Sequence, residues 1–193
     1  MMKTTIKQDQ TELIEIKKSK FIGYAFFCSE VEDANVYLKQ IRQEHKKATH
    51  VCFAYVINSN EKASDDGEPQ GTAGLPILEI IKKRKLTNVL VVVVRYFGGI
   101  KLGAGGLVRA YGESATSVLN KSEEASLKEV TEFCLTLNYG EESVLNSLKN
   151  NSNVYDLSFE YFDKINVKFY SDLSFENLND YNLVKLQTKL IRV

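Results

Sequence analysis

The pattern of apolar and polar positions divides the first two thirds of the chain into alternating strands and helices. Residues 11–16 and 20–28 are rich in β-branched and aromatic side chains and are separated by a short polar segment, which predicts two paired strands. The residues from Ser29 to Glu32 fit a capping box, and apolar residues then recur at helical spacing to about Lys46. The sequence therefore predicts a helix that packs on a sheet.

A second group of elements surrounds the most apolar segment of the chain. Residues 88–94 are nearly all β-branched, which is typical of a strand buried on both faces. Residues 49–57 are predicted to form a further strand, and 58–74 a long polar loop. Helices are predicted over 75–85 and 103–120. The buried strand is expected to lie at the centre of the sheet.

The remainder of the chain follows a separate pattern. A polar, charged segment over 121–129 indicates a domain boundary, so we expect one domain over 1–130 and another over 131–193. Within the second, strands and helices are expected in the order βαββαβ, at 133–137, 141–149, 155–161, 165–169, 173–186 and 189–193. This is the ferredoxin-like order. The predicted fold class is α+β with two domains.

Composition places the chain among soluble globular proteins. Of its 193 residues, 44% are hydrophobic and 26% are charged. The first ten residues lack the features of a signal peptide, and the longest apolar run, Val89 to Val94, is far shorter than the roughly 20 residues that span a bilayer. We therefore expect a cytoplasmic protein without a membrane span. No His or Cys residues stand at metal-ligand spacing, so neither a metal nor a cofactor is expected.

The net charge of zero conceals an asymmetry. Up to Lys121 there are 18 Lys and Arg against 13 Asp and Glu, which gives +5, and the remainder has 7 against 12, which gives −5. A polyanion would be attracted to the first part of the chain and repelled by the second.

Six of the eleven glycines lie between Gly98 and Gly112, after the buried strand and around the start of the next helix. Glycine lets the backbone approach a phosphate closely, and free N–H groups at a helix start attract anions. The spacing fits neither a Walker loop nor a dinucleotide fingerprint. Tight packing of strand against helix is the competing explanation. The predicted phosphate- or RNA-binding residues are Arg95, Gly98, Gly99, Lys101, Gly103, Gly105, Gly106 and Arg109.

An acidic loop precedes this region. Clustered carboxylates can bind a divalent cation or act in acid-base catalysis, but adjacent acids in a turn more often cap the backbone. We therefore expect a supporting role, without a metal or a catalytic residue, for Asp65, Asp66, Glu68, Gly71 and Gly74. His50 is interpreted as a packed or surface residue, because the sequence places no carboxylate or nucleophile beside it.

The second domain is rich in aromatic residues on two adjacent predicted strands. Aromatic side chains on a ferredoxin-like sheet can stack on RNA bases. The accompanying basic residues are absent here, which favours contact with a protein or with the first domain. The aromatic residues concerned are Tyr155, Phe159, Tyr161, Phe162, Phe169 and Tyr170.

Four motifs together closely resemble those of the Impact family, in its bacterial YigZ-like branch. They are the segments 18–23 (KSKFIG), 64–69 (SDDGEP), 71–74 (GTAG) and 95–111 (RYFGGIKLGAGGLVRAY). The resemblance implies a first domain built like domain IV of elongation factor G, a superfold shared with a small-subunit ribosomal protein and with small-molecule kinases. It implies a ferredoxin-like second domain similar to domain V of that factor. RNA or the ribosome is the ligand that this domain order suggests.

Eukaryotic Impact proteins restrain the kinase that shuts down translation on amino-acid starvation, through an extra N-terminal domain that has no counterpart in the motifs above. The resemblance therefore suggests a non-catalytic regulator of translation. Because the same superfold occurs in kinases, a phosphate-ester enzyme or kinase-like nucleotide binder that uses the same loop is an alternative. A protein-protein adaptor, acting through the acidic second domain, is a further one.

Overall fold

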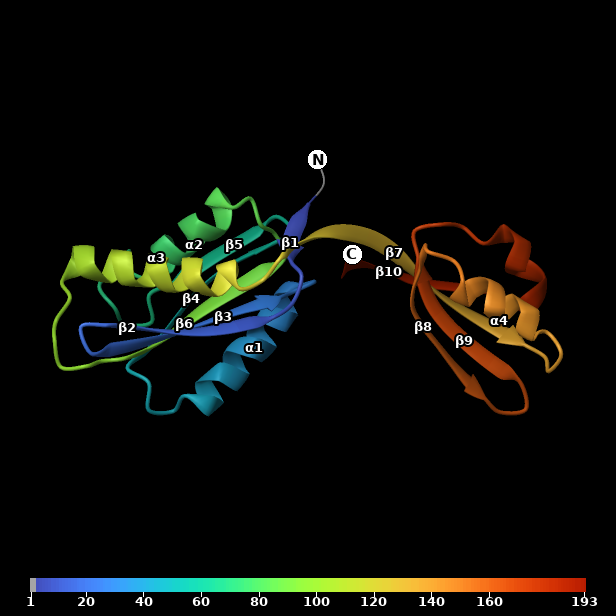
Figure 1. Cartoon of the computed structure of the whole chain (residues 1–193), viewed down its shortest axis with the longest axis horizontal. Helices are drawn as coiled ribbons and strands as arrows, with labels where there is room; N and C mark the ends of the chain where they lie inside the picture. Colours follow the sequence, from blue (N-terminus) through green and yellow to red (C-terminus); the bar gives the residue numbers. More distant parts are fainter. Residues whose placement is uncertain (1–2) are drawn as a thin grey trace. The chain divides into compact units, whose positions relative to one another are not determined.

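The computed structural model describes residues 3–193 and shows an α+β protein of two compact units with two antiparallel sheets (Figure 1). The first unit runs to Leu127 and includes Arg192 and Val193, and the second is Lys128–Ile191. Within residues 3–193, no helix is long and apolar enough to cross a membrane.

The sheet of the first unit has the strand order β2-β3-β6-β4-β5, and every pair is antiparallel. Its strands are β2 (Gln10–Ile16), β3 (Ser19–Phe27), β6 (Val89–Tyr96), β4 (His50–Ile57) and β5 (Asn60–Ser64). Helices α2 (Gly74–Lys83) and α3 (Ala104–Asn120) cover one face, and α1 (Val31–Glu44) covers the other (Figure 1). Because both faces are covered, β6 is buried, as its β-branched sequence predicted.

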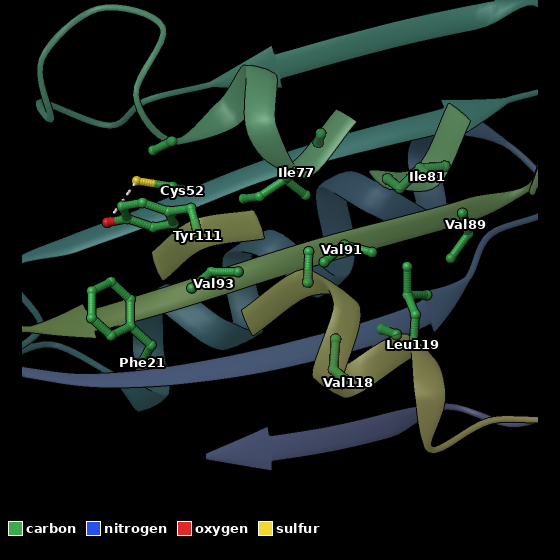
Figure 2. Packing of buried hydrophobic residues seen from close by; sticks show 14 of the residues in the cluster. Phe21, Cys52, Ile77, Ile81, Val89, Val91, Val93, Tyr111, Val118 and Leu119 are labelled. Atoms are coloured by element: carbon green, nitrogen blue, oxygen red, sulfur yellow. Dashed lines mark hydrogen bonds between the residues drawn. The ribbon is translucent and has the colours of Figure 1, made fainter. Parts of the chain in front are cut away.

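Alternate residues of β6 contribute to two separate cores. Val91 and Val93 point toward α2 and α3, where the ring of Phe21 meets that of Tyr111 edge to face, with 5.3 Å between ring centroids (Figure 2). The Cys52 thiol donates a 3.4 Å hydrogen bond to the Tyr111 hydroxyl in the same core (Figure 2). Burial raises the pKa of Cys52 to about 12. Its thiol is therefore protonated at neutral pH.

Two strands of the first unit were not predicted. Residues 60–64, interpreted as loop, form β5, which pairs with β4 through the two-residue turn at Asn58 and Ser59. Residues Thr4–Ile6 form β1, which pairs with the first residues of β7 (Glu124–Leu137). The sequence of β5 is polar, so its pairing with β4 rather than its own side chains determines its conformation, whereas β1 consists of three β-branched residues.

The start of α1 also differs from the prediction. Glu30 rather than Ser29 is the N-cap residue, and Asp33 rather than Glu32 completes the capping box. The Asp33 carboxylate accepts hydrogen bonds from the backbone N–H groups of Ser29 and Glu30. The capping box therefore forms one residue later than predicted and still provides acceptors for backbone N–H groups at the helix start.

The strands of the second unit follow the order β10-β7-β9-β8 in the other five-stranded sheet, whose fifth strand is β1. Besides β7, the elements of the second unit are α4 (Glu142–Lys149), β8 (Val154–Tyr161), β9 (Ile165–Ser171) and β10 (Val184–Arg192). The predicted helix over 173–186 is wrong, since only the 3₁₀ helix Glu176–Tyr181 forms there. Asn182 ends it with a φ of 51°, and the chain then joins the edge of β7.

Candidate functional site

The glycine-rich segment connects the end of β6 to α3, and its glycines fall into two classes. Gly98 lies directly against the β2–β3 turn, because a Cβ added there would stand 1.9 Å from the carbonyl oxygen of Lys18. The Gly98 N–H donates to the Ser19 hydroxyl at 3.1 Å. Gly98 therefore fits the explanation of tight packing.

Three glycines around the start of α3 are different, whereas Gly106 is closely packed, with an added Cβ 3.0 Å from the Cβ of Leu102. A Cβ at Gly99, Gly103 or Gly105 would meet nothing within 4 Å, so the packing of the chain requires no small residue there. Gly99 and Gly103 do have positive φ values, 85° and 73°, which favour glycine. Gly105 has neither a close neighbour nor a positive φ that would require glycine.

Helix α3 begins without a side-chain cap and without an acidic residue in its first turn. The first N–H groups of a helix have no intrahelical acceptor and carry a partial positive charge. Lys101 and Arg109 are both exposed beside this helix start. The local field therefore favours an anion.

A cavity of about 340 Å³ lies beside the start of α3. Its wall combines four segments, of which only the last two are close together in the sequence. They are the start of β4 (Thr49, His50), the acidic loop (Glu68, Pro69), the end of β6 (Arg95, Phe97), and the start of α3 with the residues before it (Lys101–Ala104, Leu107). The cavity thus joins the two segments that the sequence predicted separately, the glycine-rich run and the acidic loop.

A buried ion pair forms one wall of the cavity. Arg95 Nη1 donates to Glu68 Oε1 at 2.6 Å, and the Tyr111 hydroxyl donates to the same oxygen at 2.8 Å. The Arg95 and Glu68 side chains are only 6% and 4% exposed. Arg95 therefore reaches the cavity as half of a neutral pair rather than as a free cation. Burial, together with contacts to Cys52 and Glu68, raises the pKa of Tyr111, so its hydroxyl stays protonated.

His50 presents a free ring nitrogen beside this pair. Its Nδ1 lies 2.8 Å from the backbone carbonyl of Asp66, and a carbonyl only accepts, so Nδ1 carries the proton. In the neutral ring, Nε2 is then an acceptor, 3.8 Å from Glu68 Oε2. No described side chain or backbone group donates a hydrogen bond to Oε2. Nothing in the local sequence brings His50 and Glu68 together, since they stand 18 positions apart.

Asp65 holds the acidic loop against the start of α2. Its Oδ1 accepts hydrogen bonds from the N–H groups of Ala73 and Gly74, at 3.0 and 2.8 Å, and its Oδ2 accepts from Gly71 at 2.8 Å. Burial raises the pKa of Asp65, but the three backbone hydrogen bonds outweigh burial and lower it. Gly74 is closely packed, because a Cβ there would lie 2.5 Å from the Ser64 nitrogen.

Asp66 fixes the other end of the loop. Its carboxylate accepts from the Val51 N–H and from Arg42 Nη2, each at 2.7 Å, while its backbone adopts a φ of 44°. Within residues 3–193, no three His, Cys, Asp or Glu side chains cluster as a metal site. Asp65 and Asp66 are thus engaged in backbone and side-chain contacts that shape the cavity wall.

The motifs and the fold define a known class of protein. The model of the Impact N-terminal domain matches residues 17–119, which include the β3–α3 core and the cavity residues described above. The chain therefore belongs to the Impact family, in its bacterial YigZ/YvyE-like branch, and carries a second domain after the family domain.

Individual relatives show the extent of this similarity. Impact family member YvyE of Bacillus subtilis is 51% identical over 119 residues, which cover 60% of this chain and 55% of YvyE. A crystal structure of a hypothetical protein matches 88% of this chain and 85% of its own with a TM-score of 0.65 and 31% identity. Yih1, described as a two-domain translational regulator, matches 61% of this chain and 46% of its own at 25% identity, with a TM-score of 0.38.

Proposed function

We propose that this Impact-family protein is a non-catalytic, cytoplasmic regulator of translation that binds RNA or the ribosome through the start of α3. One observation carries the proposal. The N-terminus of α3 is exposed and uncapped, and glycines that packing does not explain stand there beside Lys101 and Arg109. Such a surface admits the phosphate backbone of an extended ligand without steric hindrance.

The distribution of charge supports the same choice. The surface lies in the part of the chain that carries +5, whereas the remainder carries −5.

The folds that the family resemblance implies for the two units also favour a role in translation. We assign the first unit to the superfold of elongation factor G domain IV, and the second to the ferredoxin-like class of domain V. The order β10-β7-β9-β8 supports the second assignment, because a ferredoxin-like βαββαβ sheet has its fourth strand beside its first.

Charge reversal at the α3 start tests the proposal. Lys101→Glu combined with Arg109→Glu is expected to abolish co-sedimentation with ribosomes and binding of RNA, while the thermal midpoint stays nearly unchanged because both side chains are exposed. Lys39→Glu on α1 is the matched control, since that exposed lysine lies on the helix that covers the opposite face of the sheet. Unchanged co-sedimentation of the double variant would refute the assignment.

The cavity also supports the rival enzyme hypothesis, because the free Nε2 of His50 stands beside a carboxylate as a general base would. A thermal-shift series with ATP, GTP and Mg²⁺ separates the two. Saturable stabilisation by one nucleotide, followed by release of phosphate, would favour the enzyme. No stabilisation and no turnover would favour the non-catalytic proposal.

The second unit offers a surface for a protein partner, the further alternative. Tyr139, Tyr161 and Phe162 are 57%, 55% and 61% exposed, and the rings of Tyr139 and Tyr161 stack with centroids 6.4 Å apart. Crosslinking in cells that recovers one protein and no RNA would support an adaptor. Recovery of RNA would support the proposal made here.

A further inference from the structure

The cavity beside α3 contains two hydrogen-bond acceptors that the protein leaves without a donor. They are Glu68 Oε2, on a side chain that is 4% exposed, and His50 Nε2, 3.8 Å away, which accepts a hydrogen bond when the ring is neutral. Both residues line the cavity, where water or a ligand can supply the donor. A ligand group that fits here must carry donors, which a fully ionised phosphate does not.

The opposite side of the cavity has the complementary character. Lys101 and the uncapped N-terminus of α3, at Gly103 and Ala104, line it and favour an anion. The carboxylate of Glu68 would repel that anion. A ligand is therefore oriented with its negative group at the helix start and its donor groups toward Glu68 and His50.

An exposed aromatic ring completes the cavity. Phe97 is 46% exposed although it lines the cavity, and the guanidinium of Arg95 lies 5.5 Å from its ring centroid. Exposed aromatic rings beside cationic groups are the usual platforms on which unpaired bases stack. The apolar side chains of Pro69, Leu102 and Leu107 line the same space.

We propose that this cavity holds the 3′-terminal ribonucleotide of a single-stranded RNA, with its base on Phe97, its phosphate at the start of α3, and its free 2′- and 3′-hydroxyls donating to Glu68 Oε2 and His50 Nε2. The inference rests on the proposed function and adds a ligand subsite to it. The volume of about 340 Å³ lies at the lower end of the range for small-ligand pockets, which suits one nucleotide rather than a larger cofactor.

The arrangement predicts discrimination between RNA and DNA. Deoxyribose lacks the 2′-hydroxyl, so a bound DNA strand would leave one of the two acceptors unpaired in the cavity. A site built to bind a hydroxyl rejects the analogue that lacks it, because its own polar group then stays unsatisfied. The phosphate contacts at Lys101 and the base contact at Phe97 would be the same for both nucleic acids.

Fluorescence anisotropy with a short 5′-labelled oligoribonucleotide that has a free 3′ end, and with the oligodeoxyribonucleotide of the same sequence and label, tests the inference. The wild-type chain is expected to bind the RNA at least about tenfold more tightly. His50→Leu removes one acceptor and is expected to reduce this preference severalfold while DNA binding stays unchanged. His50→Gln, whose amide retains an acceptor, is expected to preserve most of the preference.

Two further variants separate the base contact from the sugar contact. Phe97→Leu is expected to weaken RNA and DNA binding alike, by about tenfold, because a stacking platform is lost for either. Phe162→Leu, at an exposed aromatic residue of the second unit, is the matched control and is expected to change neither.

The outcomes distinguish this inference from the proposed function. Equal affinity of the wild-type chain for RNA and DNA, with binding still lost in the Lys101→Glu and Arg109→Glu variant, would overturn the ribonucleotide subsite and leave the proposed function in place. No binding of RNA or ribosomes by the wild-type chain would overturn both. An RNA preference that survives His50→Leu would overturn the role given to His50.

Discussion

Two ion pairs, one in each unit, differ sharply in burial. In the first unit, Arg95 and Glu68 form an ion pair with side chains only 6% and 4% exposed, and Tyr111 donates to the same carboxylate oxygen. In the second unit, Lys128 and Asp172 form a 2.9 Å pair with side chains 34% and 26% exposed. If one residue of the buried pair is removed, the other charge is left unpaired in the interior. If one residue of the exposed pair is removed, water can solvate the charge that remains. The comparison shows that burial, more than charge alone, marks where the chain is built for a specific contact.

The largest expected effect comes from breaking the buried pair. Glu68→Ala leaves Arg95 charged and the Tyr111 hydroxyl without an acceptor in the protein interior, so we expect the free energy of unfolding to fall by about 3–5 kcal/mol. Asp172→Ala is the comparison in the second unit and should produce no resolvable change. Urea denaturation of both variants measures the difference. Equal, small losses would mean that the Arg95–Glu68 pair is as dispensable as a surface pair.

A second contrast lies within the glycine-rich segment. Gly98→Ala is expected to lower the free energy of unfolding by about 1–3 kcal/mol, because its Cβ would collide with backbone 1.9 Å away. Gly105→Ala should leave stability unchanged or raise it by up to about 1 kcal/mol, since the site is open and alanine favours a helix. Thermal or chemical denaturation reports both. A similar loss in the two variants would show that packing explains the entire segment.

A smaller, pH-dependent effect is expected at the acidic loop. Asp65→Ala removes the acceptor for three backbone N–H groups at the start of α2 and should cost about 1–2 kcal/mol at neutral pH. The lowered pKa of Asp65 means that its contribution is complete above the ordinary value of 3.8 and is lost as the pH falls through the lowered value. The stabilities of wild type and variant should therefore converge in acid. A gap that stays constant down to strongly acidic pH would contradict this cause.

Long, strongly periodic segments of the fold were predictable from the sequence. The strand over 88–94 and the helices over 75–85 and 103–120 correspond to β6, α2 and α3, because their apolar spacing reflects a buried face directly. Strand β5 was not predictable, since its residues Asn60–Ser64 are polar and become a strand only through pairing with β4. The 3₁₀ helix Glu176–Tyr181 replaced a predicted helix because residues from Val184 onward pair with β7 instead.

The candidate site was predictable only in its separate pieces. The glycine-rich run and the acidic loop are recognisable as local patterns, but their meeting in one cavity depends on the sheet order. His50 was interpreted as a packed or surface residue because its carboxylate neighbour, Glu68, is distant in sequence. Similarly, Arg95 was expected to contact phosphate, a role that no observation tests, and its burial against Glu68 follows from the position of β6 rather than from its own motif.

On the proposals above, RNA lies along the start of α3 and enters the cavity beside it. Ultraviolet crosslinking of RNA to the full chain in cells, followed by identification of the modified peptides, tests this most directly. We expect the RNA adducts in the segment 95–109, with Phe97 among the modified residues, and their loss in the Lys101→Glu and Arg109→Glu variant. Adducts confined to the aromatic residues of the second unit, or no RNA adduct at all, would contradict the account.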